Sequence, residues 1–142
     1  MTIGILVVVA LLIAGTAFGL WRRRVDGRLR DAHRASATQA AETLSPADIG
    51  GDLGARATLV HFSSAFCQPC RATRALLAQI ADSTAGVVTV DIDAEHHLDL
   101  VRRLHIMRTP TVLVLDRTGV IHSRASGLPR KDEVLAAIGA LT

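Results

Sequence analysis

The sequence predicts an α/β fold, a three-layer sandwich with a mixed central sheet and helices on both faces, preceded by one N-terminal transmembrane helix. Three observations predict it. From residue 57 onward, strand and helix patterns follow one another in the order β-α-β-α-β-β-α. The strand runs are nearly continuous Val, Leu and Ile, which is typical of strands buried on both faces. Residues 3–21 contain no charged residue.

The uncharged segment 3–21 has the length of a membrane span. At ~1.5 Å per residue it nearly crosses the ~30 Å hydrocarbon core of a bilayer. Trp21 ends it where an interfacial aromatic residue is expected, and an arginine cluster follows at once. A secretory signal peptide has its positive charge before the apolar stretch, so this order favours an uncleaved anchor. We therefore expect the lipid bilayer to be a partner of residues 3–21.

The positive charge of the chain is concentrated next to this anchor. Residues 22–34 hold six arginines and two aspartates, a net +4, so the rest of the chain carries −1 of the total +3. The positive-inside rule places this flank, and the domain after it, in the cytoplasm. The opposite orientation is the alternative, because single-span proteins do break the rule. The basic segment is short and is not a face of the domain, so we expect no nucleic-acid partner.

The composition predicts one modest domain behind an anchor and a linker. Residues 22–52 form the basic juxtamembrane segment and linker, and residues 53–142 form the domain. Within the linker, 28–44 is a candidate helix continuing from the anchor. Residues 45–56 hold Pro46 and three glycines in a short space, which indicates a loop.

The domain pattern predicts four strands and three helices. An apolar run at 57–63 leads into an amphipathic helix at 67–82, and the next strand follows. This β-α-β order predicts a right-handed parallel crossover, and the last two strands form an antiparallel hairpin. The remaining elements are a strand at 86–93, a helix at 94–106, strands at 111–116 and 120–126, and a helix at 130–142.

The only two cysteines of the chain, Cys67 and Cys70, lie within one helical turn after the first strand. Pro69 falls in the first turn of the helix, where its missing N–H costs nothing. Cys67 is then at the helix N-terminus, where unpaired N–H groups and the helix dipole stabilise a thiolate. Cys70 is placed one turn deeper, where it can attack a mixed disulfide formed by Cys67.

The stretch "FCQPC" after a strand, followed about forty residues later by "TPTVLVLDRTGVI", resembles the thioredoxin family over residues 57–141. The resemblance implies a thioredoxin-like fold with Cys67 as the attacking cysteine and Cys70 as the resolving one. It also implies a cis Pro110 beside them, with Thr109 offering its backbone to the substrate chain. Gly127 corresponds to the family's glycine near the same surface.

Several residues depart from the usual family pattern. Phe66 stands where thioredoxins have a tryptophan, and we expect it on the substrate-binding surface. Gln68 replaces the glycine between the cysteines, and His61 replaces a buried aspartate. Strand alternation puts His61 on the same face as Ser63, under the covering helices, so we expect it to be buried or half-buried. A neutral imidazole there could accept the proton of Cys70; a core histidine bonded to the backbone is the alternative.

Together these features predict an enzyme, a membrane-tethered thiol–disulfide oxidoreductase. Its partners are protein disulfides and an electron donor that the sequence does not identify. A cytoplasmic domain favours disulfide reduction, because that compartment is reducing. We expect no cofactor and no metal. Two alternatives use the same cysteines: a zinc or copper carrier, for which His96, His97 and His105 offer further ligands, or a redox-inactive scaffold with the thiols as small core residues.

Overall fold

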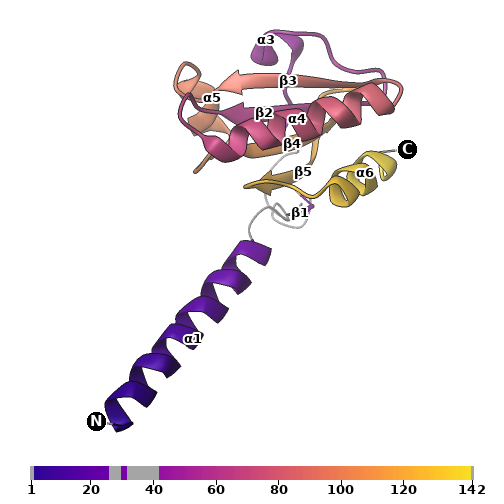
Figure 1. The fold of residues 1–142 in the computed structure, drawn as a ribbon. Coiled ribbons are helices and arrows are strands. Elements are labelled where there is room, and N and C mark those ends of the chain that lie inside the picture. Colours follow the sequence, from indigo (N-terminus) through magenta and orange to yellow (C-terminus); the bar gives the residue numbers. More distant parts are fainter. Residues whose placement is uncertain (1, 26–29, 32–41, 142) are drawn as a thin grey trace.

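The computed structural model describes residues 2–25, 30–31 and 42–141, and it confirms the predicted α/β class (Figure 1). The helices of the described chain are α1 (Thr2–Val25), α3 (Pro46–Ile49), α4 (Gln68–Ser83), α5 (Leu98–Arg103) and α6 (Lys131–Gly139). The strands are β1 (Arg30–Asp31), β2 (Ala57–Ser63), β3 (Val87–Asp93), β4 (Thr111–Asp116) and β5 (Ile121–Ser126).

The elements from β2 onward follow the predicted order. The bounds of β2 and β4 are those predicted, and β3 and β5 each begin one residue later. Helix α5 is much shorter than the predicted 94–106. Asp93 explains the late start, because its carboxylate accepts hydrogen bonds from the backbone of Glu95 at 2.9 Å and from the ring of His96 at 2.8 Å. Such local bonds stabilise a turn in competition with a helix.

The sheet is mixed, with the strand order β1-β5-β4-β2-β3. β2 pairs with β3 in parallel, and α4 provides the crossover between them. β4 is antiparallel to both β2 and β5, so the predicted hairpin of β4 and β5 is confirmed. β1 contributes two residues at the edge, and the four longer strands make up the body of the sheet.

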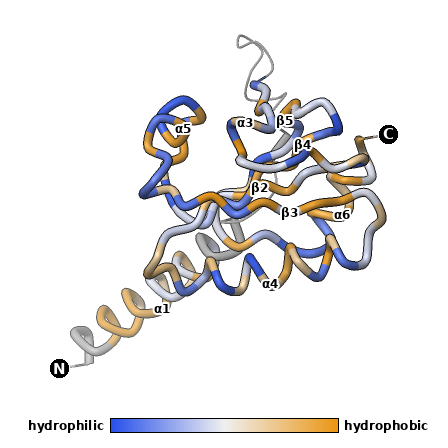
Figure 2. The backbone as a smooth tube through the Cα atoms, turned by 90° about the horizontal axis from the view of Figure 1, so that it is seen from above, coloured by the Kyte–Doolittle hydropathy of each residue, from blue (hydrophilic) through white to orange (hydrophobic). Residues whose placement is uncertain are grey.

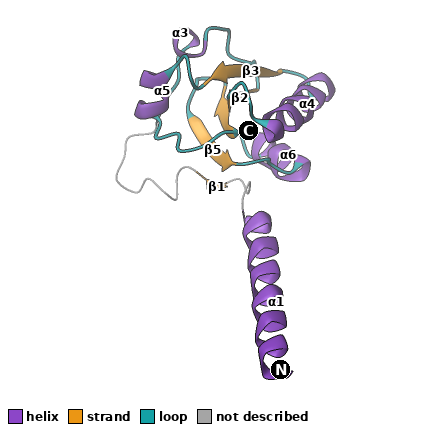
Figure 3. Ribbon diagram, turned by 60° about the vertical axis from the view of Figure 1, so that its left-hand side comes forward, coloured by secondary structure: helices purple, strands orange, loops and turns teal. Residues whose placement is uncertain are grey.

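Helices cover both faces of the sheet, α4 and α6 on one side and α3 and α5 on the other (Figure 3). The buried side chains form two almost wholly aliphatic clusters, and Figure 2 shows hydrophobic residues along β2, β3 and β4. Under α4 and α6 lie Ala57, Leu59, Leu77, Ile80, Val87, Val112, Val114, Ala125, Val134 and Ile138. Under α3 and α5 lie Leu44, Ile49, Val60, Phe62, Ile92, Leu100, Leu104, Ile106, Leu113, Leu115 and Ile121.

The segment before β2 differs from the prediction. The expected helix over 28–44 is wrong where the structure describes it, because β1 pairs with β5 and Thr43 bridges to Val120. The free edge of the β4–β5 hairpin offers unpaired backbone groups that this segment satisfies. The rest of the expected helix, 28–29 and 32–41, lies outside the described residues. The expected loop 45–56 contains α3, which Ser45 caps.

Helix α1 extends over 24 residues and projects apart from the sheet (Figure 1). Its large apolar side chains between Leu6 and Trp21 are exposed. The transmembrane helix expected at 3–21 is not confirmed: over the residues that the structure describes, no helix combines the length and the hydropathy needed to cross a bilayer.

Candidate active site

A disulfide joins Cys67 and Cys70 at the start of α4, with an S–S distance of 2.05 Å and a Cα–Cα distance of 5.2 Å. Cys67 is the N-cap of the helix and is half-buried, whereas Cys70 is only 3% exposed. The backbone N–H of Cys70 donates a hydrogen bond to Sγ of Cys67 at 3.2 Å. The structure therefore places the more accessible sulfur at the unpaired end of the helix, where an anion is stabilised.

The local sequence explains why the helix begins here. β2 ends at Ser63, and a turn closes with the backbone N–H of Cys67 donating to the carbonyl of Ser64 at 3.3 Å. Pro69 lies in the first turn, as the sequence predicted. Its carbonyl accepts a hydrogen bond from the hydroxyl of Thr73, which is fully buried. The turn thus delivers both sulfurs at the carboxyl end of β2.

A second loop meets the cysteine loop at this end of the sheet. The Thr109–Pro110 peptide bond is cis, which confirms the sequence prediction. The hydroxyl of Thr109 lies 3.0 Å from that of Ser64, and this contact joins the two loops. The N–H of Gly127 donates to the carbonyl of Pro110 at 2.7 Å. Gly127 has φ of 105°, a conformation that glycine adopts without steric cost.

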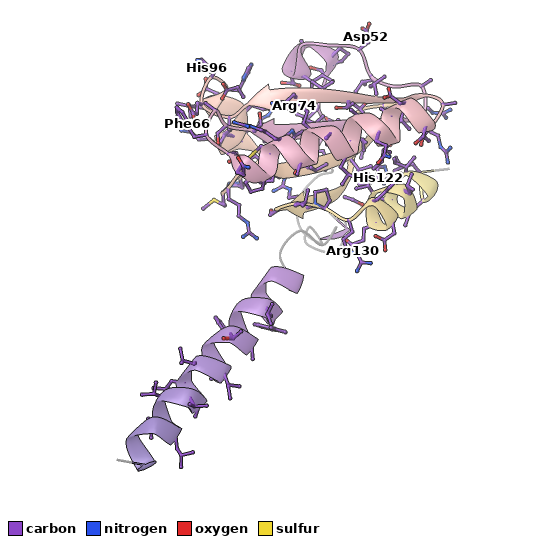
Figure 4. All side chains as sticks on the ribbon, in the orientation of Figure 1. Asp52, Phe66, Arg74, His96, His122 and Arg130 are labelled. Atoms are coloured by element: carbon purple, nitrogen blue, oxygen red, sulfur yellow. A yellow bond between two sulfur atoms is a disulfide. The ribbon has the colours of Figure 1, made fainter. Side chains whose placement is uncertain are left out.

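Two apolar side chains near these loops point into solvent. Phe66 is fully exposed and stands next to Cys67 in the chain, and Figure 4 shows it projecting from the end of the domain where α4 begins. Met107, which sequence reasoning missed, is 89% exposed and precedes Thr109 by two residues. Exposed large apolar residues beside a reactive group are suited to contact with another protein.

His61 is buried, 1% exposed, and belongs to a polar network behind the cysteines. Its Nδ1 lies 2.8 Å from Oδ2 of Asp91, the residue opposite it on β3. The same carboxylate accepts hydrogen bonds from the hydroxyl of Ser63 at 2.6 Å and from Nε of Arg74 at 2.8 Å. Nε2 of His61 is buried and has no hydrogen-bond partner among the described residues.

A pocket of about 260 Å³ lies between part of this polar network and the two cysteines. Both cysteines line it, together with Ser63, Arg74 and Asp91. Figure 4 shows Arg74 on the face of α4 that is turned toward β3. A charge on Asp91 is therefore close to the place where the sulfurs exchange protons.

The surroundings of His61 and Asp91 lower the pKa of both side chains. Burial lowers the pKa of His61 below its ordinary value, and the hydrogen bond to Asp91 opposes the shift without cancelling it. Burial acts to raise the pKa of Asp91, but the hydrogen bonds from Arg74 and Ser63 and the proximity of His61 outweigh it, so its pKa is lowered. At neutral pH the pair is therefore a neutral imidazole and a carboxylate. An ionised carboxylate only accepts hydrogen bonds, so Nδ1 carries the proton.

The structure thus places Thr109 against Ser64 in the cysteine loop, and Gly127 against Pro110. Sequence reasoning missed this network of Asp91, Ser63 and Arg74. The contact between Asp91 and His61 could have been predicted from the strand pairing. If the two predicted parallel strands are aligned at their carboxyl ends, Ser63 lies opposite Asp93 and His61 lies opposite Asp91. For the metal alternative, the described part of the chain holds no group of three or more His, Cys, Asp or Glu side chains arranged to bind an ion.

The chain is similar to known proteins. The thioredoxin family profile matches residues 52–140 of the chain. The thioredoxin of Mycoplasma genitalium is 29% identical over 77 residues, which cover 54% of this chain and 74% of that protein.

Two solved thioredoxin structures resemble the fold. A mutant thioredoxin from Halobacterium salinarum superimposes with a TM-score of 0.58 at 21% identity, over 67% of this chain and 80% of that one. The short form of spinach chloroplast thioredoxin F gives a TM-score of 0.57 at 21% identity, over 72% of this chain and 89% of that one.

Proposed function

Because this chain belongs to the thioredoxin family and is a thiol–disulfide oxidoreductase, we propose that it reduces protein disulfides through a Cys67/Cys70 dithiol–disulfide cycle while tethered to a membrane. The observation that carries the cycle is the asymmetry of the two sulfurs. Cys67 caps the helix and is accessible, and Cys70 is buried one turn behind it.

The first step is attack by Cys67. In the reduced protein its thiolate, stabilised by the N–H groups at the start of α4, attacks one sulfur of a substrate disulfide. A bond forms between Cys67 and that sulfur, the substrate S–S bond breaks, and the other substrate sulfur leaves as a thiolate. We propose that Phe66, Thr109 and Gly127 provide the binding surface for the substrate chain, with Pro110 beside it.

The second step is resolution by Cys70. Its thiol gives up a proton, and the thiolate attacks Sγ of Cys67. The Cys67–Cys70 disulfide forms, the mixed disulfide breaks, and the substrate departs with both cysteines reduced. We propose His61 as the acceptor of that proton, directly or through one water. Both lie on the α4 side of the sheet at the carboxyl end of β2, and a neutral imidazole suits the role at neutral pH. An electron donor then returns the pair to the dithiol.

A chromogenic disulfide tests both steps in one trace. The reduced full-length chain, purified in mild detergent, is mixed with 4,4′-dithiodipyridine. Attack by Cys67 releases one equivalent of thiopyridone, and resolution by Cys70 releases the second. We expect Cys70→Ser to give only the first phase, Cys67→Ser to lose the fast phase, and His61→Ala to slow only the second. A fast first phase in Cys67→Ser would reverse the two roles.

Insulin reduction then tests the activity itself. The parent is expected to accelerate precipitation of the insulin chains in the presence of a small dithiol, and either cysteine-to-serine variant to lack turnover. Equal rates for the parent and the Cys67→Ser variant would overturn the proposed function. Cells carrying Cys70→Ser are expected to accumulate substrates disulfide-bonded to Cys67, and these identify the physiological partners.

The membrane tether rests on the sequence of residues 3–21 and on the exposed apolar side chains of α1. The arginines after Trp21 support a cytoplasmic position for the domain, which in turn supports reduction over oxidation. We expect the full chain to stay with membranes after carbonate extraction, and a chain that begins at residue 42 to be released. A reporter fused after Thr142 that is active only outside the cytoplasm would contradict the sidedness.

A further inference from the structure

The unpartnered Nε2 of His61 is the feature of the site that the thiol chemistry alone does not explain. It is a polar atom inside a side chain that is 1% exposed, and burying such an atom without a hydrogen bond is costly. The opposite ring nitrogen is held at 2.8 Å by Asp91. The imidazole ring is therefore held through Nδ1, while Nε2 makes no hydrogen bond to the described residues.

Asp91 is itself held by two further donors. Ser63 binds Oδ1 at 2.6 Å, and Nε of Arg74 binds Oδ2 at 2.8 Å. Three donors from β2 and α4 thus converge on one carboxylate of β3 whose side chain is 30% exposed. They keep it ionised and stop it from rotating away from His61.

We propose that Asp91 is a positioning residue that locks His61 in the Nδ1–H tautomer, so that Nε2 is the internal atom that receives the proton of Cys70 during resolution. The proposal rests on the dithiol–disulfide cycle above and assigns its proton path. In the step, the Cys70 thiol loses its proton to Nε2, the thiolate attacks Sγ of Cys67, and the substrate sulfur leaves as a thiolate. The resulting imidazolium is stabilised by the Asp91 carboxylate and later loses its proton to solvent.

Few groups around His61 affect this equilibrium. Asp91 faces it from β3, and the guanidinium of Arg74 on α4 binds the same carboxylate. Cys70 is a buried residue of the same helix, and α4 covers the face of the sheet on which His61 lies. The residue opposite it on β4 is Val112, which carries no charge. The positive charge of Arg74 opposes protonation of His61, and the carboxylate favours it. Changes at Asp91 and Arg74 are thus expected to act on His61 in opposite directions.

The decisive variant is Asp91→Asn, examined in the full-length chain in mild detergent. An amide can donate to Nδ1, which would move the ring proton to Nε2 and block it as an acceptor. We expect the first thiopyridone phase at the parental rate and the second slowed by about tenfold or more. We also expect the ¹⁵N shifts of the His61 ring to change from the Nδ1–H to the Nε2–H pattern. A parental second phase, or an unchanged tautomer, would overturn the proposal.

Asp116→Asn is the matched control, because Asp116 also pairs with a histidine, His122 at 2.9 Å, at the far end of the sheet from the cysteines. It loses an equivalent Asp–His bond and is expected to keep both phases. A parent without a first phase would instead refute the dithiol–disulfide cycle, while the ¹⁵N spectrum would still decide the tautomer.

A second pair of variants keeps the test valid if Asp91→Asn does not fold. Arg74→Gln removes an exposed side chain and its positive charge, so His61 becomes easier to protonate. The pH at which the second phase loses half its rate is expected to move upward. Arg71→Gln removes the same charge from the same helix. Arg71 lines the same pocket but makes no hydrogen bond to Asp91 in the described part of the chain, so its midpoint is expected to move less than that of Arg74→Gln. Equal midpoints in Arg74→Gln, Arg71→Gln and the parent would contradict the network.

Discussion

Nε2 of His122 lies 2.9 Å from Oδ2 of Asp116, and this pair closes the turn between β4 and β5. The other oxygen of Asp116 accepts hydrogen bonds from the hydroxyl and the backbone N–H of Thr118. Burial acts to raise the pKa of Asp116, but these hydrogen bonds outweigh it and lower the pKa to about 2. The carboxylate therefore stabilises the folded hairpin wherever it is ionised.

Asp116→Asn is expected to lower the free energy of unfolding at neutral pH by on the order of 1 kcal/mol, after allowance for solvent screening. The pKa of Asp116 is lower in the folded protein, so its contribution is present above about pH 4 and is lost as the pH falls toward 2. Urea unfolding at both ends of this range measures the difference. Asp99→Asn, at a fully exposed position, serves as the control, and an equal loss there would show that Asp116 has no special role.

His61→Gln is expected to flatten the dependence of stability on pH. The pKa of His61 is below its ordinary value of 6.5 in the folded protein, so below about pH 6.5 the unfolded chain binds a proton that the native state does not. The parent therefore loses stability as the pH falls, by at most about 1.4 kcal/mol per pH unit for one proton. Unfolding of the oxidised parent and variant from about pH 8 to about pH 5 compares the slopes. Identical slopes would show that the native ring is freely protonated.

Phe66→Ala is expected to leave stability within about 0.5 kcal/mol, because a fully exposed ring loses no buried contacts. It is expected to lower kcat/KM for insulin several-fold, a loss of roughly 1 kcal/mol in substrate binding. The rate with 4,4′-dithiodipyridine should not change, since that small disulfide does not reach across the surface. Leu135→Ala on α6 is the matched apolar control. If both variants reduce insulin at the parental rate, Phe66 is not part of the binding surface.

Leu77→Ala is expected to destabilise the domain by about 2–5 kcal/mol, because Leu77 is fully buried between α4 and the sheet. Leu76 is its neighbour on the same helix and is only partly buried, so Leu76→Ala is expected to cost about 1 kcal/mol or less. Urea unfolding midpoints of the two variants give the comparison directly. A similar loss in both would mean that α4 packs with a different face.

The predictable part of the structure is the part with strong local signals. β2 and β4 are runs of Val, Leu, Ile and similar residues bounded by breakers, so their ends agree with the prediction. The start of α4 was predictable because Pro69 is typical of the first turn of a helix. The burial of His61 followed from strand alternation together with the helices expected on both faces of the sheet.

The unpredicted part depends on partners far apart in the chain. From its position in β3, Asp91 is expected to be an ordinary exposed acid. Only the pairing of β3 with β2 places it beside His61. Arg74 has the position of a solvent-exposed residue on α4, and its sequence position does not predict the hydrogen bond to the carboxylate of Asp91. β1 forms because the β5 edge is available to it, since two residues have no strand signal of their own. Such contacts are set by the assembled sheet and cannot be read from a window of sequence.

The disulfide between Cys67 and Cys70 closes a very small ring, since the two residues are only three positions apart. A cross-link lowers the conformational entropy of the unfolded chain, and this effect grows with the logarithm of the number of residues in the closed loop. A loop this short contributes roughly 2 kcal/mol, against about 4.7 kcal/mol for a loop of 100 residues. Both cores lie in the sheet and its helices, outside the ring. The bond can therefore open and close while the fold stays intact. The cysteine pair takes up two electrons when the bond opens and gives them up when it closes, and the bond contributes little to holding the fold together.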